Sequence, residues 1–262
     1  MKVLSIDLDY IMYPTEHVYN DIGWENHPLA RWNNFYEIAD DKQRNLFYDE
    51  CRLQFLKELF TKVIQQCDNV KFDYEHDNIL YYLKDVDSID LINIDQHDDV
   101  LCGNYYYCDN SGDERYKYNL EFNNLREYDC VNEGNWIGWL ASKRKLKSFS
   151  WIGNSGRIDY EKFDSINQLM PYTKIDYTFN YDFGDYKFDL VFLCLSPCYI
   201  PQEFWNLFNW FINEYEKKYN VSINPKDWDS RKIEIECRYS KVTDEILHKC
   251  SNDREPVSGE GI

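Results

Sequence analysis

The chain has 262 residues and carries 29 Lys and Arg against 47 Asp and Glu, so its formal net charge is −18 at pH 7. Binding to nucleic acid or to an anionic membrane requires a basic surface, so we expect neither as a partner. Aromatic residues make up 18% of the chain, which excludes a disordered acidic protein.

Membrane spans and export signals are not expected from the sequence. No stretch reaches about 18 apolar residues, and the start, MKVLSIDLDY, lacks the apolar region and cleavage site of a signal peptide. The nine cysteines are odd in number and form no CxxC pair, which favours free thiols in a reducing cytoplasm. A zinc site at Cys194 and Cys198 is disfavoured, because no further ligands stand at finger spacing.

The first part of the chain predicts two apolar strands separated by helices. Residues 2–8 form a short apolar run that is typical of a buried parallel strand, and residues 43–66 carry apolar side chains at helical spacing. A short helix is expected over 77–83, and the run IDLINI at 89–94 predicts the clearest strand.

The second part continues the alternation of strands and helices. We expect a loop or lid at 102–130, a short helix at 135–140, strands at 148–152, 175–179 and 188–195, a helix at 201–219 and an edge strand at 231–237. This order predicts an α/β fold with a mostly parallel sheet flanked by helices. With no repeat or clear linker, residues 1–250 are expected to form a single domain and 251–262 a disordered tail.

Two of the predicted strands end in acidic residues. The first leads into Asp7 and Asp9, and the second into Asp95, His97 and Asp99. In an extended segment, alternation would point the residues of each set the same way, and ligands of parallel sheets gather at this edge. If the strands are neighbours, four carboxylates and an imidazole therefore converge.

Converging carboxylates need a counter-charge, because they cannot all ionise close together. Two divalent cations would supply it, and oxygen ligands with a minority of imidazole suit Mn²⁺ better than zinc. Two such ions about 3.5–4 Å apart can share a hydroxide and act as a hydrolytic centre.

These residues resemble the arginase family of ureohydrolases, which pairs a DxHxD strand end with an SxDxD strand end. The chain has DQHDD at 95–99 and SIDLD at 5–9, with a further histidine at His76. It is more similar to the peptide arginases of ribosomal-peptide biosynthesis and their uncharacterised relatives. That similarity lies in Glu75, His76 and Leu80, in NIDQHDD, in the segment 133–136 (EGNW) and in 195–197 (LSP).

The resemblance implies a fold, an activity and a ligand set. It implies an arginase/deacetylase-like domain and a peptide arginase, a hydrolase of linear amidine C–N bonds that converts arginine residues of a precursor peptide to ornithine and urea. A hydroxide shared by two Mn²⁺ ions would attack the guanidinium carbon, with Asp99 carrying the proton. One ion would be held by His76, Asp95, Asp99 and Asp7, and the other by Asp95, His97, Asp7 and Asp9.

Two features depart from the ordinary arginase pattern. The DxD motif precedes DxHxD here, so the motif order looks circularly permuted. Ordinary arginases also have a proton-shuttling histidine just after a Gly-Asn pair, whereas Gly134 and Asn135 are followed by Trp136 and Ile137. We therefore expect a different route for the proton, or an accidental pairing.

Candidates for binding the substrate are less defined. Glu133 is the first candidate to pair with a guanidinium, with Glu25 and Glu203 as alternatives. Asn135 would contact the substrate or, as we favour, cap the following helix. The aromatic side chains of 104–107 and Trp24 either line a peptide groove or, as we favour, pack into the fold.

Other functions stay open on the sequence. The scaffold could serve a metal-dependent amidohydrolase or deacylase acting on another C–N bond, or a non-catalytic module that sequesters a basic peptide. A serine hydrolase is disfavoured, because Ser196 lacks the GxSxG elbow and precedes a proline.

Overall fold

The structure, a computed structural model, describes residues 1–12, 32, 48–100, 106–108, 114–116, 134–153, 174–176, 183–185, 187–201 and 204–223. The predicted edge strand at 231–237 and the predicted tail at 251–262 lie outside these residues, as do Glu25, Glu133 and Glu203.

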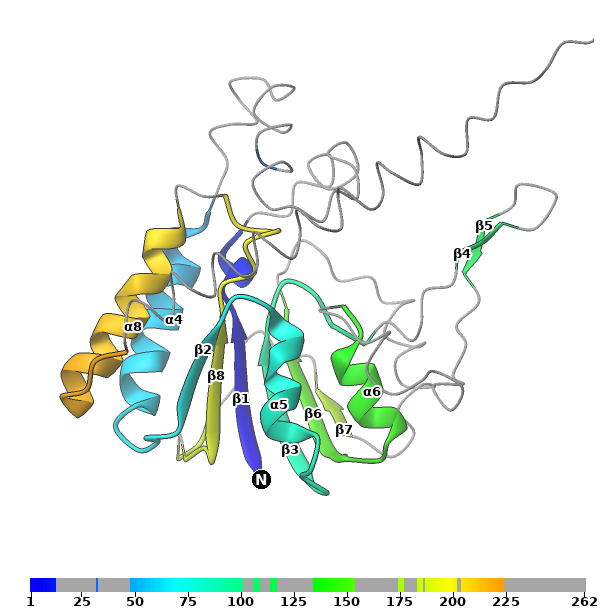
Figure 1. Cartoon of the computed structure of the whole chain (residues 1–262), viewed down its shortest axis with the longest axis horizontal. Coiled ribbons are helices and arrows are strands. Elements are labelled where there is room, and N and C mark those ends of the chain that lie inside the picture. Colours follow the sequence, from blue (N-terminus) through cyan, green and yellow to red (C-terminus); the bar gives the residue numbers. More distant parts are fainter. Residues whose placement is uncertain are drawn as a thin grey trace, which may run out of the picture.

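A six-stranded sheet forms the centre of the fold, in the order β2-β8-β1-β3-β6-β7 (Figure 1). Every pair of neighbours in it is parallel. The strands are β1 (Lys2–Asp7), β2 (Val70–Asp73), β3 (Ile89–Ile94), β6 (Leu146–Ile152), β7 (Lys174–Asp176) and β8 (Leu190–Cys194). Their carboxyl ends therefore meet at one edge, opposite the amino terminus of the chain.

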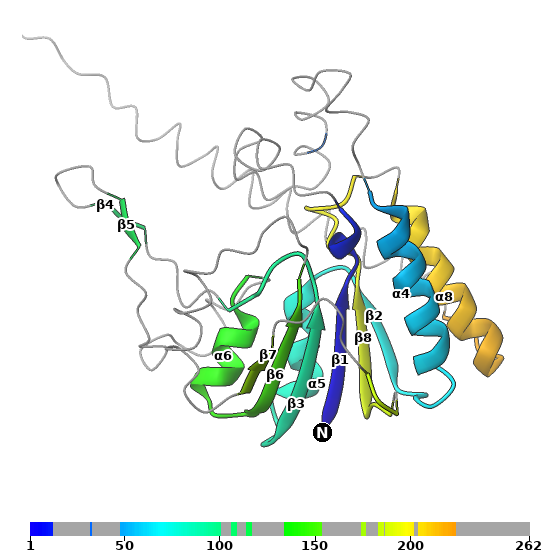
Figure 2. The same ribbon diagram turned by 180° about the vertical axis from the view of Figure 1, so that it is seen from behind.

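Helices cover both faces of this sheet. They are α4 (Glu50–Val63), α5 (Leu80–Leu83), α6 (Trp136–Ser142) and α8 (Trp205–Tyr219), with 3-10 turns η1 (Leu8–Ile11) and η2 (His76–Ile79). One core cluster joins α4 and α8 to one face through Leu56, Phe60 and Phe211. The other joins α5 and α6 to the opposite face through Leu80, Trp136 and Leu140. Figure 1 shows α5 in front of the strands, and in Figure 2, seen from behind, α5 lies behind them while α4 and α8 lie beside β2.

These observations confirm the predicted α/β class and the parallel sheet flanked by helices. Two helix starts were wrong. The helix predicted from residue 43 begins at Glu50, because Asp49 accepts hydrogen bonds from the backbone N–H groups of Cys51 and Arg52 and so caps it. The helix predicted from residue 201 begins at Trp205, after a turn in which the Phe204 N–H donates to the Pro201 carbonyl.

Three further strands were not expected. Strand β2 has only four residues, too few for a clear alternation. Within the segment predicted as a loop or lid, β4 (Tyr106–Cys108) pairs antiparallel with β5 (Glu114–Tyr116).

The helices of the described residues include none with the length and apolar character that a membrane span requires. No disulfide joins the cysteines whose side chains are described.

Candidate metal centre

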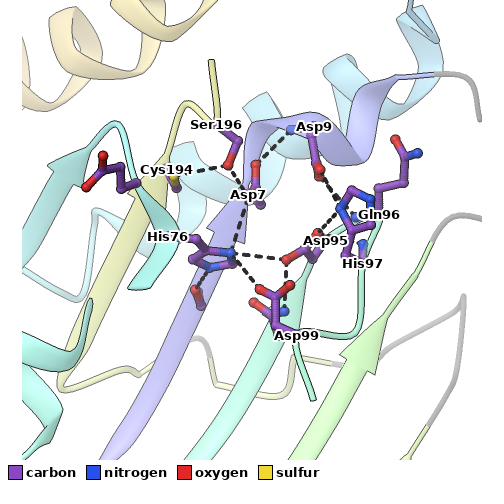
Figure 3. A network of polar contacts seen from close by, with 12 residues as sticks. Asp7, Asp9, His76, Asp95, Gln96, His97, Asp99, Cys194 and Ser196 are labelled. Atoms are coloured by element: carbon purple, nitrogen blue, oxygen red, sulfur yellow. Dashed lines mark hydrogen bonds and ion pairs between the residues drawn. The ribbon is translucent and has the colours of Figure 1, made fainter. Parts of the chain in front are cut away.

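The two acidic strand ends lie side by side. Strands β1 and β3 are direct neighbours, and Ile6 pairs with Ile94, so Asp7 and Asp95 follow at matching positions of the same edge. Figure 3 shows Asp7, Asp9, His76, Asp95, His97 and Asp99 directed toward one another. The expectation that the two motifs meet is therefore confirmed by the sheet order.

The way they meet differs from the prediction. Extended alternation does not continue past Asp7, because η1 begins at Leu8 and the Asp9 N–H donates to Asp7 Oδ1 at 3.0 Å. Asp7 and Asp9 consequently face different partners: Asp7 faces His76, and Asp9 faces His97. A turn after the strand, rather than the strand itself, divides the carboxylates between two groups.

The first group surrounds His76, which lies at the start of η2 and is 1% exposed. Its Nδ1 lies 3.2 Å from Asp7 Oδ2, 3.1 Å from Asp95 Oδ2 and 2.9 Å from Asp99 Oδ2. The three carboxylates come from β1, from the end of β3 and from the loop beyond it. This buried set is called the His76 group below.

The second group surrounds His97. Its Nδ1 lies 2.9 Å from Asp9 Oδ2 and 3.7 Å from Asp95 Oδ1. The His97 side chain is 26% exposed, so this set, called the His97 group below, is the more open one. The ring of Tyr199 lies beside it, with 4.7 Å between ring centroids. Asp7 was also expected here, but its Oδ1 accepts the Asp9 N–H instead.

Asp95 belongs to both groups. One of its oxygens faces His76 and the other faces His97. Backbone and side-chain donors hold it in this position: the His97 N–H donates to Oδ1 at 2.7 Å, and Asn93 Nδ2 donates to Oδ2 at 3.2 Å. This is the arrangement that a carboxylate bridging two cations requires.

Two buried atoms of the site suit a cation. His76 Nδ1 and Asp9 Oδ2 make no hydrogen bond to the described residues. His76 Nδ1 nevertheless lies close to carboxylate oxygens, and Asp9 Oδ2 lies close to the His97 imidazole. A buried polar atom without a hydrogen bond is costly, and a bound cation would relieve that cost. Asp7, His76 and Asp95, and separately Asp9, Asp95 and His97, place one ligand atom each within 4.8 Å of one another. The residues present can hold a metal ion.

The shifted pKa values of the cluster also indicate that it lacks positive charge. Burial, and then the negative charges of Asp7 and Asp95, raise the pKa of Asp9 to about 8. Burial, and then Asp99 and Asp7, raise the pKa of Asp95 to about 7. Burial lowers the pKa of His76, but the three carboxylates beside Nδ1 outweigh it and raise the pKa well above 6.5. Without a metal, protons supply the missing positive charge.

Comparisons with known proteins do not assign the chain to a family. Protein-family models, curated proteins and solved structures all gave no match to the chain. The fold and the site therefore carry the functional argument.

A second layer of polar side chains holds the ligands. Ser5 Oγ lies 2.6 Å from His76 Nε2, Ser196 Oγ donates to Asp7 Oδ2, and Trp136 Nε1 donates to Asp99 Oδ2. Sequence reasoning missed these roles, although all three residues lie in motifs quoted for the resemblance. Ser5 had a detectable signal, because a period of two places it on the same face of β1 as Asp7.

Ser5 provides a direct test of this layer. A cation on Nδ1 requires the proton of a neutral His76 to sit on Nε2, where it donates to Ser5 Oγ. If the His76 group holds a divalent cation, we expect Ser5→Ala to weaken its binding, measured with Mn²⁺ as the probe, by about 10–100-fold. Isothermal titration with Mn²⁺ measures the loss.

The matched control is Ser148→Ala. Ser148 Oγ donates to Asp90 Oδ1 at 2.6 Å, on strands of the same sheet but outside the cluster. This variant should bind Mn²⁺ as the parent does. Equal Mn²⁺ affinity in Ser5→Ala and Ser148→Ala would contradict a role for Ser5 in the site.

The predicted substrate residues are placed only in part. Asn135 is buried and occupies the N-cap position of α6, as favoured, although its side chain makes no capping hydrogen bond. The Asn135 backbone at this N-cap position has a φ of −139° and a ψ of 2°. Glu133 and Trp24 lie outside the described residues.

Proposed function

We propose that this protein is a hydrolase with two Mn²⁺ ions that converts arginine residues of a precursor peptide to ornithine and releases urea. The observation that carries the proposal is Asp95, whose two oxygens face two separate His- and Asp-containing groups. A carboxylate shared in this way suits a pair of ions rather than a single one. Because the donors are mainly carboxylate oxygens, Mn²⁺ fits them better than zinc does.

The residues divide the work between the two groups. His76, Asp7, Asp95 and Asp99 would hold the buried ion, and His97, Asp9 and Asp95 the more open one. When bound, the ions supply hydroxide near neutral pH. Asp99 Oδ2 is occupied by the Trp136 indole N–H, so a proton carried by Asp99 would move at Oδ1.

The substrate class follows from charge and from access. The −18 balance and the acidic cluster favour a cationic side chain over an anionic one. The His97 group is the more exposed of the two, so the substrate would enter on that side, past Tyr199. An arginine side chain within a peptide has the required positive charge, and its guanidinium carbon would be the centre open to attack by hydroxide.

Urea release tests the proposed reaction. The protein is loaded with Mn²⁺ and incubated or co-expressed with an arginine-containing precursor peptide. We expect urea, together with a peptide mass loss per event equal to that of urea less one water. His97→Ala should abolish both signals, because it removes the imidazole of the open group. Asp90→Asn, at a half-buried position on β3 whose side chain accepts hydrogen bonds from Ser148 and Lys147, should retain them.

The outcomes separate the alternatives. Release of another amine or acid without urea would favour the amidohydrolase or deacylase. Peptide binding without any product, unchanged in folded His97→Ala, would favour a non-catalytic acidic binding protein. Either result would overturn the peptide arginase proposal.

A further inference from the structure

Asp99 is held in an unfavourable backbone conformation. It lies beyond the end of β3 and has a φ of 53°, in the left-handed region of backbone conformation that residues other than glycine rarely adopt. Such conformations persist only where the surrounding structure determines them, and they cluster at functional sites. The groups that determine this one come from α6.

The first turn of α6 contacts Asp99 through both its backbone and its side chain. The N–H groups of Ile137 and Gly138 donate to the Asp99 carbonyl at 3.1 and 3.4 Å. The indole Nε1 of Trp136 donates to Asp99 Oδ2 at 2.7 Å. That same oxygen lies 2.9 Å from His76 Nδ1. The contact therefore connects α6 directly to the His76 group.

Trp136 is wholly buried and packs against the same histidine. Its exposed fraction is 0%, and its ring centroid lies 5.0 Å from that of His76. A buried indole N–H needs an acceptor, and here the acceptor is a carboxylate of the cluster rather than a backbone carbonyl. A charged acceptor makes this hydrogen bond stronger than a neutral one would be.

We propose that Trp136 is a positioning residue, which fixes Asp99 Oδ2 in the His76 group and so completes the buried cation site. Rotation of the Asp99 side chain would withdraw Oδ2 from His76 Nδ1, and the indole hydrogen bond opposes that rotation. The proposal rests on the proposed metal centre but not on the proposed reaction. It can be tested by Mn²⁺ binding alone.

The first test removes the indole N–H. We expect Trp136→Phe to weaken binding of one of the two Mn²⁺ ions by about 10–100-fold, the usual cost of losing an outer partner of a ligand. Replacing Trp136 by benzothienylalanine keeps the ring shape and removes only the donor, so it decides the question if the phenylalanine variant does not fold. Trp139→Phe, on the same helix with its ring under Lys143, is the control and should bind both ions normally.

A double-mutant cycle distinguishes positioning from general packing. If Trp136 acts through Asp99, Trp136→Phe should cause no further loss of Mn²⁺ affinity in an Asp99→Ala background. The same loss in both backgrounds would overturn the proposal, as would unchanged Mn²⁺ affinity in the folded benzothienylalanine protein. A chain that binds both ions but releases no urea would remove the proposed reaction and leave this inference standing.

Discussion

We expect replacement of Asp95 with asparagine to weaken the binding of both proposed Mn²⁺ ions at once. Asp95 is the only one of the ligating carboxylates described whose two oxygens face both histidines. The loss of an outer partner costs about 10–100-fold in metal affinity, and the loss of a charged ligand shared by two ions should cost more in each. Equilibrium dialysis with Mn²⁺ will show a fall from two tightly bound ions per chain to none.

Single replacements of the histidines should behave differently. His76→Ala removes a ligand of the buried group and His97→Ala one of the open group, so each should mainly affect one ion. Asp90→Asn makes the same chemical change within β3, five residues before Asp95, where the side chain accepts hydrogen bonds from Ser148 and Lys147, and should bind both ions. An Asp95→Asn protein that still binds two ions tightly would contradict the bridging role.

We expect removal of the proposed metal ions to destabilise the protein, and more so at high pH. A ligand at 100 times its Kd stabilises the folded state by about 2.7 kcal/mol per site, so two filled sites contribute about 5 kcal/mol. For a domain of this size that corresponds to roughly 10–20 °C in Tm. Thermal unfolding with and without EDTA, from pH 5.5 to 8.5, measures the difference.

The sign of the pH effect follows from the raised pKa values. In the metal-free fold the pKa of Asp9 is about 8 and that of Asp95 about 7, against an ordinary 3.8. Their protonated forms stabilise the fold fully below pH 3.8, and this contribution is lost as pH rises through about 7 and 8. His76, with a raised pKa, acts in the same direction. Metal binding has the opposite dependence, because protons compete for the ligands as pH falls.

The control for this prediction is the metal-free double variant Asp9→Asn, Asp95→Asn. It lacks the two carboxylates whose pKa values are raised, first by burial and then by neighbouring negative charges, so its Tm should depend less on pH. It should also be more stable than the metal-free parent at pH 8.5. A metal-free parent whose Tm is constant or rises between pH 5.5 and 8.5 would contradict the electrostatic account.

Much of the site was predictable because it depends on short-range pattern and on a general property of parallel sheets. Apolar runs before Asp7 and Asp95 indicated two buried strands, and carboxyl ends of parallel strands share an edge. His76 was predictable only through the resemblance. Strand β2, which leads toward it, has four residues and was not predicted.

The supporting residues were harder to predict, because their partners are distant in the chain. Ser196 donates to Asp7 across 189 positions, and Ser5 contacts His76 across 71. Such pairs depend on β8 lying between β2 and β1, and sequence order does not reveal that arrangement. The division into a His76 group and a His97 group depends on η1, which breaks the alternation on which the prediction relied.

Anomalous scattering at the manganese edge, from crystals grown with Mn²⁺, tests the two-cation centre most directly. We expect two peaks. One should lie among His76 Nδ1 and the carboxylates of Asp7, Asp95 and Asp99, and the other among His97 Nδ1, Asp9 and Asp95. A single peak, or no peak at this edge of the sheet, would contradict the account.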